Sequence, residues 1–131
     1  MTRLNIGDQR RPARLVGHVL LQRLGAATGE MVGAIAMTEP GTGSDLQAVR
    51  TTAVPDGNEY LINGSKTFIT NGDVADLYLL FGKWSEIKES RSAISVLILE
   101  KGTPGFSVVS KERKMGHNGS STCAIDFDNM R

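Results

Sequence analysis

The chain has 131 residues and a mass of 14.1 kDa, which suits one domain and leaves little room for a second. Hydrophobic residues make up 40% and charged residues 22%, an ordinary globular composition that argues against wholesale disorder. Fifteen Lys and Arg residues against 14 Asp and Glu leave a formal charge of +1, so charge gives no reason to expect a nucleic acid or an anionic membrane surface as a partner.

Residues 1–30 differ in pattern from the rest of the chain. Apolar side chains recur there at helical spacing beside a polar stripe, which predicts a short amphipathic helix near residues 14–24. Gly25 is predicted to end that helix. The Arg-rich residues before it show no periodicity, and we expect this N-terminal segment to be partly disordered.

From residue 31 to residue 131 the pattern is that of β-strands, and we expect this range to form one β-barrel domain. Met31–Met37 is a continuous apolar run, typical of a buried strand. Strands are predicted at 50–54 and 59–63, on either side of Pro55-Asp56-Gly57-Asn58. That tetrapeptide is a turn because Pro presets φ and Gly accepts a positive φ.

Two Asn-Gly pairs lie in the segment that follows, residues 63–72. Asn63-Gly64 predicts a tight hairpin leading to a strand that starts near Lys66, and Asn71-Gly72 predicts the end of that strand. Further strands are expected at 76–83, 93–99, 105–110 and 122–128. About seven or eight short strands predict an all-β fold, a small closed or partly open antiparallel barrel or sandwich.

The segment Ala36–Asp45 is the first candidate site. Its proline ends a strand, and Gly41 and Gly43 let the backbone turn sharply and approach a ligand closely. Hydroxyls and exposed N–H groups there suit an anion or a carbonyl. The spacing is not that of a phosphate-binding loop, because the region after it reads as strand. The alternative is an ordinary connection built from turn residues.

The second candidate site lies in the strand that starts near Lys66. Phe68 and Thr70 are two residues apart, so their side chains are expected on one face. A ring beside a hydroxyl suits a planar heteroaromatic ligand, which packs on the ring and bonds to the hydroxyl. Taken alone, the residues also fit a core phenylalanine beside an ordinary strand threonine.

The remaining polar residues predict structure more than chemistry. We expect Glu39 to hold the glycine loop through backbone hydrogen bonds and Asp45 to stabilise a turn. Cys123 is the only cysteine, which excludes an intramolecular disulfide, and it is expected to be a buried, inert thiol. His18 and His117 lack a second ligand at metal spacing, so no metal site is predicted.

In order and spacing, these motifs closely resemble the middle β-barrel domain of the acyl-CoA dehydrogenases. The resemblance covers residues 29–131. Besides the two candidate segments, it includes Gly102-Thr103-Pro104-Gly105-Phe106, Lys114-Met115-Gly116 and Ser121-Thr122-Cys123. Thr-Glu-Pro-x-x-Gly-Ser-Asp followed by Phe-Ile-Thr-Asn-Gly is a specific combination.

The resemblance implies FAD as the cofactor, with the flavin lying against the barrel. Backbone groups of Met37, together with Thr38, match positions that hydrogen-bond the polar edge of the flavin ring. Phe68 matches the aromatic residue, often Trp, that packs on the flavin. Thr70 matches the threonine whose hydroxyl lies near flavin N5 and O4.

The resemblance also implies an oxidoreductase of lipid metabolism and fatty acid oxidation, which dehydrogenates acyl-CoA thioesters between the α and β carbons. A carboxylate removes the α-proton, the β-hydrogen passes as hydride to the flavin, and electrons leave to an electron-transfer flavoprotein. Ser44 matches a serine that contacts the diphosphate or the acyl-CoA, and Ser121 matches a polar position lining the CoA channel. The implied location is the cytoplasm, or the mitochondrial matrix in a eukaryote.

The main departure from the family is length. Members are roughly three times longer, with helical domains before and after the barrel, and their catalytic glutamate lies in the C-terminal one. No residue here matches that glutamate, so we expect a fragment that has no catalytic residue, is inactive alone and self-associates. The alternatives are a non-catalytic binding or assembly module, or the same domain of an acyl-CoA oxidase-type flavoenzyme.

Overall fold

The computed structural model describes residues 25–84 and 93–131, and the chain divides into two compact units, Met1–Met31 and Val32–Arg131. In the first unit residues 25–28 are helical, and Gly29 follows with a φ of 80°. The prediction that Gly25 ends a helix is therefore wrong, because the left-handed position that favours a C-terminal glycine falls at Gly29. The helix predicted near residues 14–24 lies outside the described residues.

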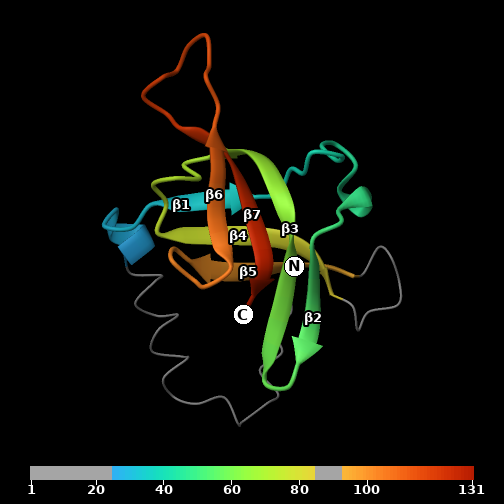
Figure 1. Cartoon of the computed structure of the whole chain (residues 1–131). Helices are drawn as coiled ribbons and strands as arrows, with labels where there is room; N and C mark the ends of the chain where they lie inside the picture. The colour runs from blue at the N-terminus through green and yellow to red at the C-terminus, as the bar shows by residue number, and fades with distance from the viewer. Residues whose placement is uncertain (1–24, 85–92) are drawn as a thin grey trace. The chain divides into compact units, whose positions relative to one another are not determined.

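The second unit is an all-β fold of seven strands and one short 3-10 helix, which confirms the predicted fold class (Figure 1). The strands are β1 (Gly33–Ala36), β2 (Thr52–Asp56), β3 (Glu59–Thr70), β4 (Leu77–Trp84), β5 (Ile94–Glu100), β6 (Phe106–Lys111) and β7 (Thr122–Met130). The helix η1 (Leu46–Ala48) lies between β1 and β2, where the sequence predicted strand. The Asp45 carboxylate accepts a hydrogen bond from the Gln47 amide at 3.0 Å and so starts this helix, in the turn-stabilising role expected for it.

The sheet is mixed, so the expectation of an antiparallel sheet throughout is wrong. The strand order is β1-β4-β2-β3-β7-β6, with β5 on β4. The pairs β2–β3, β3–β7, β4–β5 and β6–β7 are antiparallel, whereas β4 pairs parallel with both β1 and β2. Parallel pairing needs a long connection, and the chain supplies it between β1 and β4 by way of β2 and β3.

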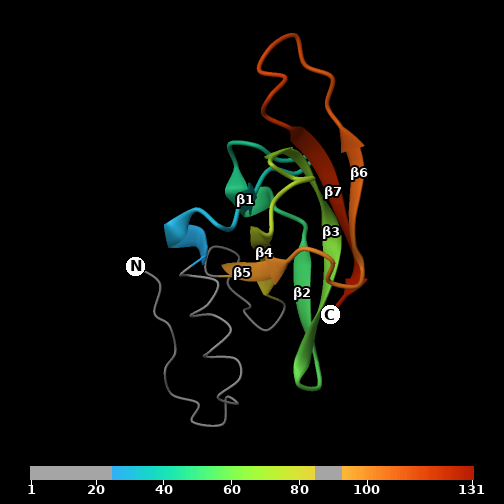
Figure 2. The same ribbon diagram turned by 90° about the vertical axis from the view of Figure 1, so that its left-hand side faces the viewer.

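The sheet curls so that two groups of strands cross. Figures 1 and 2 show β2, β3, β6 and β7 in one layer, across which β1, β4 and β5 run. The core lies between the layers. Its largest fully buried apolar side chains are Tyr78, Ile69, Leu80, Ile125, Met130 and Val49. In β7 the buried residues alternate with partly exposed ones, as the sequence predicted.

β3 is a single strand of 12 residues, which overturns the hairpin predicted at Asn63-Gly64. The strand continues through this pair with a register shift against β7 between Ile62 and Gly64. Gly64 has a φ of 154°, and a Cβ there would lie 2.8 Å from the Thr51 Cα. The glycine is therefore required by close packing of β3 against the chain at Thr51, and not by a turn.

No helix in the part of the chain that the structure describes is long and apolar enough to cross a membrane.

Candidate functional site

The C-terminal half of β3 carries a β-bulge that places two candidate residues on one face. Lys66 pairs with Ile125 of β7, but Ile69 pairs with Cys123, so β3 has one extra residue in this interval. Phe68 takes up the extra length with a φ of 57°, a conformation that a bulky residue rarely adopts. Lys66 and Ile69 both face the core, while Phe68 and Thr70 are both exposed.

Phe68 is thus displayed and not buried. Its side chain is 64% exposed, although an unpartnered aromatic ring normally favours the core. A left-handed backbone at such a residue costs on the order of 1–2 kcal/mol. The strained backbone and the exposed ring make this part of β3 a candidate binding surface.

The first candidate segment reaches the same end of β3. The carbonyl oxygen of Thr38 accepts a hydrogen bond from the Thr67 amide at 2.9 Å. The carbonyl oxygen of Met37 accepts one from the Lys66 ammonium at 3.0 Å. Met37 and Thr38 therefore lie beside the bulge that carries Phe68.

Beyond Thr38 the chain makes a tight turn. The Glu39 amide donates to the Thr42 carbonyl at 2.9 Å, and the Thr42 amide donates back to the Glu39 carbonyl at 3.1 Å. Neither Gly41 nor Gly43 has a positive φ, so the turn does not depend on glycine conformation. A Cβ at either position would meet no atom within 4 Å, which leaves the turn open to an approaching molecule. Ser44 follows on the exposed part of this loop.

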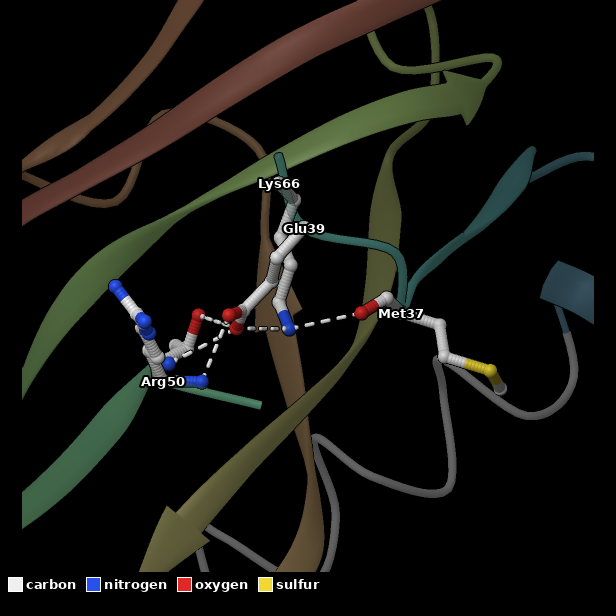
Figure 3. Close-up of polar contacts among 5 residues, drawn as sticks. Met37, Glu39, Arg50 and Lys66 are labelled. Carbon is white, nitrogen blue, oxygen red and sulfur yellow. Dashed lines mark hydrogen bonds and ion pairs between the residues drawn. The ribbon is translucent and has the colours of Figure 1, made fainter. Parts of the chain in front are cut away.

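Glu39 is buried and fully engaged by the protein (Figure 3). Its carboxylate accepts hydrogen bonds from the Arg50 amide at 2.7 Å, from the Thr51 amide at 2.9 Å and from the Thr51 hydroxyl. Burial raises its pKa, but these bonds and the one from Lys66 outweigh that effect, and the net pKa is below the ordinary value. This is the loop-holding role that the sequence predicted.

Lys66 is the partner that completes this arrangement. Its side chain is 0% exposed, and Nζ lies 2.9 Å from Glu39 Oε1 as well as 3.0 Å from the Met37 oxygen. Burial lowers the pKa of Lys66, and the Glu39 carboxylate opposes that shift. The sequence motifs do not single out Lys66, although it stands at even spacing from the buried Ile62, which predicts that both side chains face the core.

A cleft of about 310 Å³ adjoins the ion pair. The turn residues from Glu39 to Gly41, the β2 entry at Arg50 and Thr51, and the β3 residues Gly64 and Ser65 line it. The exposed Arg50 and one face of the open turn border it, and Pro40 and the glycines make much of its wall apolar. It does not include Phe68 or Thr70.

Ser121 joins the site through the backbone. Its carbonyl accepts a hydrogen bond from the Asn71 amide at 3.0 Å, and Thr70 pairs with Thr122. Its hydroxyl is buried and faces Asp73, but neither Ser121 Oγ nor Asp73 Oδ1 makes a well-formed hydrogen bond within the described residues.

Asp73 is nevertheless a strongly stabilised anion. The Ser121 hydroxyl and the Lys111 ammonium, 3.0 Å away, lower its pKa to about 2. The neighbouring Cys123 thiol is buried, and burial raises its pKa, so it is the inert thiol predicted from the sequence. Within residues 25–84 and 93–131, no cluster of three or more His, Cys, Asp or Glu side chains could hold a metal ion.

Comparison of the chain with known proteins identifies its family. A family model described as the acyl-CoA dehydrogenase, middle domain, matches residues 34–130. The chain belongs to the acyl-CoA dehydrogenase family. Met37, Thr38, Phe68 and Thr70 all lie inside the matched range.

Individual relatives and solved structures agree with this assignment. An acyl-CoA dehydrogenase of Bacillus subtilis is 50% identical over 103 residues, which are 79% of this chain and 27% of that protein. The crystal structure of an acyl-CoA dehydrogenase from Geobacillus kaustophilus is similar with a TM-score of 0.76 at 46% identity. The match covers 81% of this chain and 28% of that one. An FAD complex of PigA has a TM-score of 0.78 at 31% identity, covering 91% of this chain and 30% of that one. This chain therefore spans about a quarter of the length of the acyl-CoA dehydrogenase family members that it matches.

The buried Glu39 carboxylate makes the free energy of unfolding depend on pH. The pKa of Glu39 is lower in the folded chain than in the unfolded one, so its contribution is complete above about pH 4.5 and is lost as the pH falls through the folded value. Glu39→Gln leaves Lys66 without its anion and should lower the free energy of unfolding at pH 7 by about 3 kcal/mol. Urea unfolding at pH 7 and at pH 4 measures both effects, and the loss between these pH values should be smaller in the variant.

The matched control is Glu59→Gln, which removes an exposed carboxylate 3.6 Å from Arg131. It should change the free energy of unfolding by no more than about 0.5 kcal/mol. Equal stability losses in the two variants would contradict the role assigned to Glu39.

Proposed function

We propose that this chain is the FAD-binding middle domain of a flavin-dependent acyl-CoA dehydrogenase, and that it holds the flavin on the face formed by Met37, Thr38, Phe68 and Thr70. The observation that carries the proposal is the exposed Phe68 ring on a strained bulge beside the end of β1. The family match and the structural similarity to an FAD complex of PigA support it.

The residues on this face fit a flavin. An isoalloxazine is planar, with acceptor atoms along one edge, and needs an apolar surface beside hydrogen-bond donors. Phe68 offers the surface, and the Thr38 and Thr70 hydroxyls offer donors. The carbonyls of Met37 and Thr38 already accept hydrogen bonds from β3, so neither is free to face a ligand, and the Thr38 N–H, in the same peptide group as the Met37 carbonyl, points away from the core.

When bound, FAD would supply the two-electron acceptor of an α,β-dehydrogenation. The residues of this chain bind and orient: they fix the ring against a rigid sheet and place donors at its edge. Ser44 is exposed on the open loop, which supports a contact with the diphosphate or the acyl-CoA. Ser121 belongs to the substrate side of this proposal through its position beside Thr70, although its hydroxyl faces Asp73.

The whole enzyme to which such a domain belongs would act on an acyl-CoA and pass electrons to an electron-transfer flavoprotein, in the cytoplasm or the mitochondrial matrix. A dehydrogenase is favoured over an oxidase by similarity. Acyl-CoA dehydrogenases reach 50% identity, whereas the prolyl acyl carrier protein oxidase AnaB is 31% identical. A binding module without turnover is the outcome if FAD does not bind.

FAD binding is tested by titrating the purified chain and following flavin fluorescence and thermal unfolding. Excess FAD should raise Tm, because a ligand of the folded state stabilises it. Phe68→Ala should weaken binding about tenfold or more through the loss of aromatic contact, and Thr70→Val by a smaller factor. Neither variant should lose much stability, since both side chains are exposed.

Val109→Ala is the matched control, because it shortens an exposed apolar side chain on β6. It should bind FAD as the parent chain does. A chain that gains no thermal stability from FAD, or a Phe68→Ala variant that binds it unchanged, would contradict the proposed site.

The chain alone should not dehydrogenate acyl-CoA. Glu39, the carboxylate next to the flavin-binding residues, is 6% exposed and bonded on both oxygens, so it cannot reach a substrate proton. Dye reduction should stay at background with butyryl-, octanoyl- and palmitoyl-CoA in the presence of FAD. Turnover that disappears in Glu39→Gln would show that Glu39 is the base after all.

Self-association with a second copy is part of the proposal, and an apolar row on the outer face of the sheet supports it. Ile35, Leu79 and Ile98 are paired in register across β1, β4 and β5 and are 40–57% exposed. Ile98→Glu should shift the chain toward monomer in light scattering over a concentration series. Met115→Glu, on a fully exposed loop residue, should not. A parent chain that is monomeric at all concentrations would refute self-association.

A further inference from the structure

Lys66 is the most deeply buried charged side chain in the described part of the barrel, and the proposed flavin face does not contain it. A fully buried ammonium loses its hydration, a penalty of several kcal/mol even after relaxation. Replacing a buried ion pair by apolar residues is often neutral or stabilising, so a buried lysine is poorly explained by stability alone. The hydrogen bond from Lys66 to the Met37 carbonyl offers a better explanation.

Figure 3 shows the Lys66 ammonium between two acceptors, the Glu39 carboxylate and the Met37 carbonyl. The first bond is an ion pair within the core. The second, at 3.0 Å, is a charge-assisted bond to the main chain of the segment that leads into the proposed flavin edge. Glu39 has three further donors from Arg50 and Thr51, whereas Lys66 is the donor that fixes the Met37 carbonyl.

The geometry of the peptide unit links this carbonyl to Thr38. The Met37 carbonyl and the Thr38 N–H belong to one planar peptide group, and the described peptide bonds are trans. In a trans peptide the C=O and N–H vectors are antiparallel. By drawing the Met37 oxygen inward, Lys66 therefore turns the Thr38 N–H away from the core. The Thr38 carbonyl is held in turn by Thr67, so rotation of this segment is fixed at two successive points.

We propose that Lys66 is a positioning residue for flavin binding: by holding the Met37 carbonyl, it aims the Thr38 N–H at the edge of the flavin ring. The inference rests on the proposed function and extends it to a residue outside the flavin face. Glu39 balances the charge of Lys66 but does not touch the Met37 carbonyl, so the two members of one ion pair have different tasks.

The two tasks are separable because both partners can be changed singly and together. Glu39→Gln breaks the ion pair and leaves the lysine on the Met37 carbonyl. Lys66→Met breaks the ion pair and also frees the carbonyl. The double variant Lys66→Met/Glu39→Gln has neither buried charge, so it restores stability relative to Lys66→Met and still leaves the carbonyl free. Arg131→Met, which removes an exposed ion pair with Asp56, is the matched control for replacing a cation.

Each variant of the 131-residue chain is checked for folding by circular dichroism at 10 °C and titrated with FAD, with the affinity and the position of the bound flavin absorption bands as readouts. We expect Glu39→Gln and Arg131→Met to bind FAD within about threefold of the parent. Lys66→Met and the double variant should bind about tenfold more weakly, the size expected for one lost hydrogen bond to a flavin edge. Their bound flavin bands should also shift, because these bands respond to hydrogen bonds at the ring edge.

Three results would overturn the inference. If the parent binds FAD and the folded double variant binds it equally well with the same spectrum, the inference alone fails. If affinity follows Tm across all variants, with Glu39→Gln as weak as Lys66→Met, Lys66 is merely structural. If the parent does not bind FAD, the proposed function fails and the inference falls with it. Should Lys66→Met not fold, the double variant carries the test.

Discussion

The buried network of Glu39, Lys66 and the Met37 carbonyl is the interaction on which the arrangement of this end of the barrel depends. It ties together three places that are far apart in the sequence: the chain leaving β1, the entry to β2 and the middle of β3. Isolated charges at this depth would be strongly unfavourable. Here both oxygens of the carboxylate accept hydrogen bonds, and the ammonium is shared between an anion and a carbonyl. Because its members satisfy one another, the network stabilises the loop after β1, and within it the bond from Lys66 to the Met37 carbonyl sets the orientation of the main chain.

At this end of the barrel, β3 contributes side chains both to the core and to the outer surface. On the core side, Lys66 fixes the main chain of Met37; on the outer side, the bulge displays Phe68 and Thr70. Without the extra residue, strict alternation would put Lys66 and Ile69 on opposite faces, and one of them would be exposed. The strained backbone at Phe68 is thus the means by which β3 keeps its core contacts and still presents a ring.

The local signals of the sequence predicted much of this fold. Apolar alternation in β7, the apolar runs of β4 and β5, and the strand end at Asn71-Gly72 depend on neighbouring residues only, and they hold in the structure. The turn predicted at Pro55–Asn58 is shorter than expected: β2 continues through Pro55 and Asp56, and only Gly57 and Asn58 connect it to β3. What failed depends on distant contacts. Asn63-Gly64 looked like a turn, but its glycine makes room for Thr51 across the sheet. The parallel pairs of β4 involve strands far apart in the chain, for which a single sequence carries no pairing signal.

In the candidate site, too, the features that depend on neighbouring residues were predicted and those that depend on distant contacts were not. Spacing placed Phe68 and Thr70 on one face, and the family resemblance joined them to Met37 and Thr38, but neither predicted the bulge, which has no glycine to mark it. Lys66 was missed because a lysine in a strand usually points to solvent, and only the carboxylate that meets it from 27 residues away explains its burial.

The central claim is that this end of the barrel holds FAD. The most direct measurement is to map FAD-induced changes in the backbone amide NMR spectrum of the 14.1 kDa chain. The account predicts saturable shifts concentrated at Met37, Thr38, Phe68 and Thr70, with little change at the far end of β3 near Glu59. Saturable shifts confined to the outer face of β5 and β6, or no shifts at all, would contradict it.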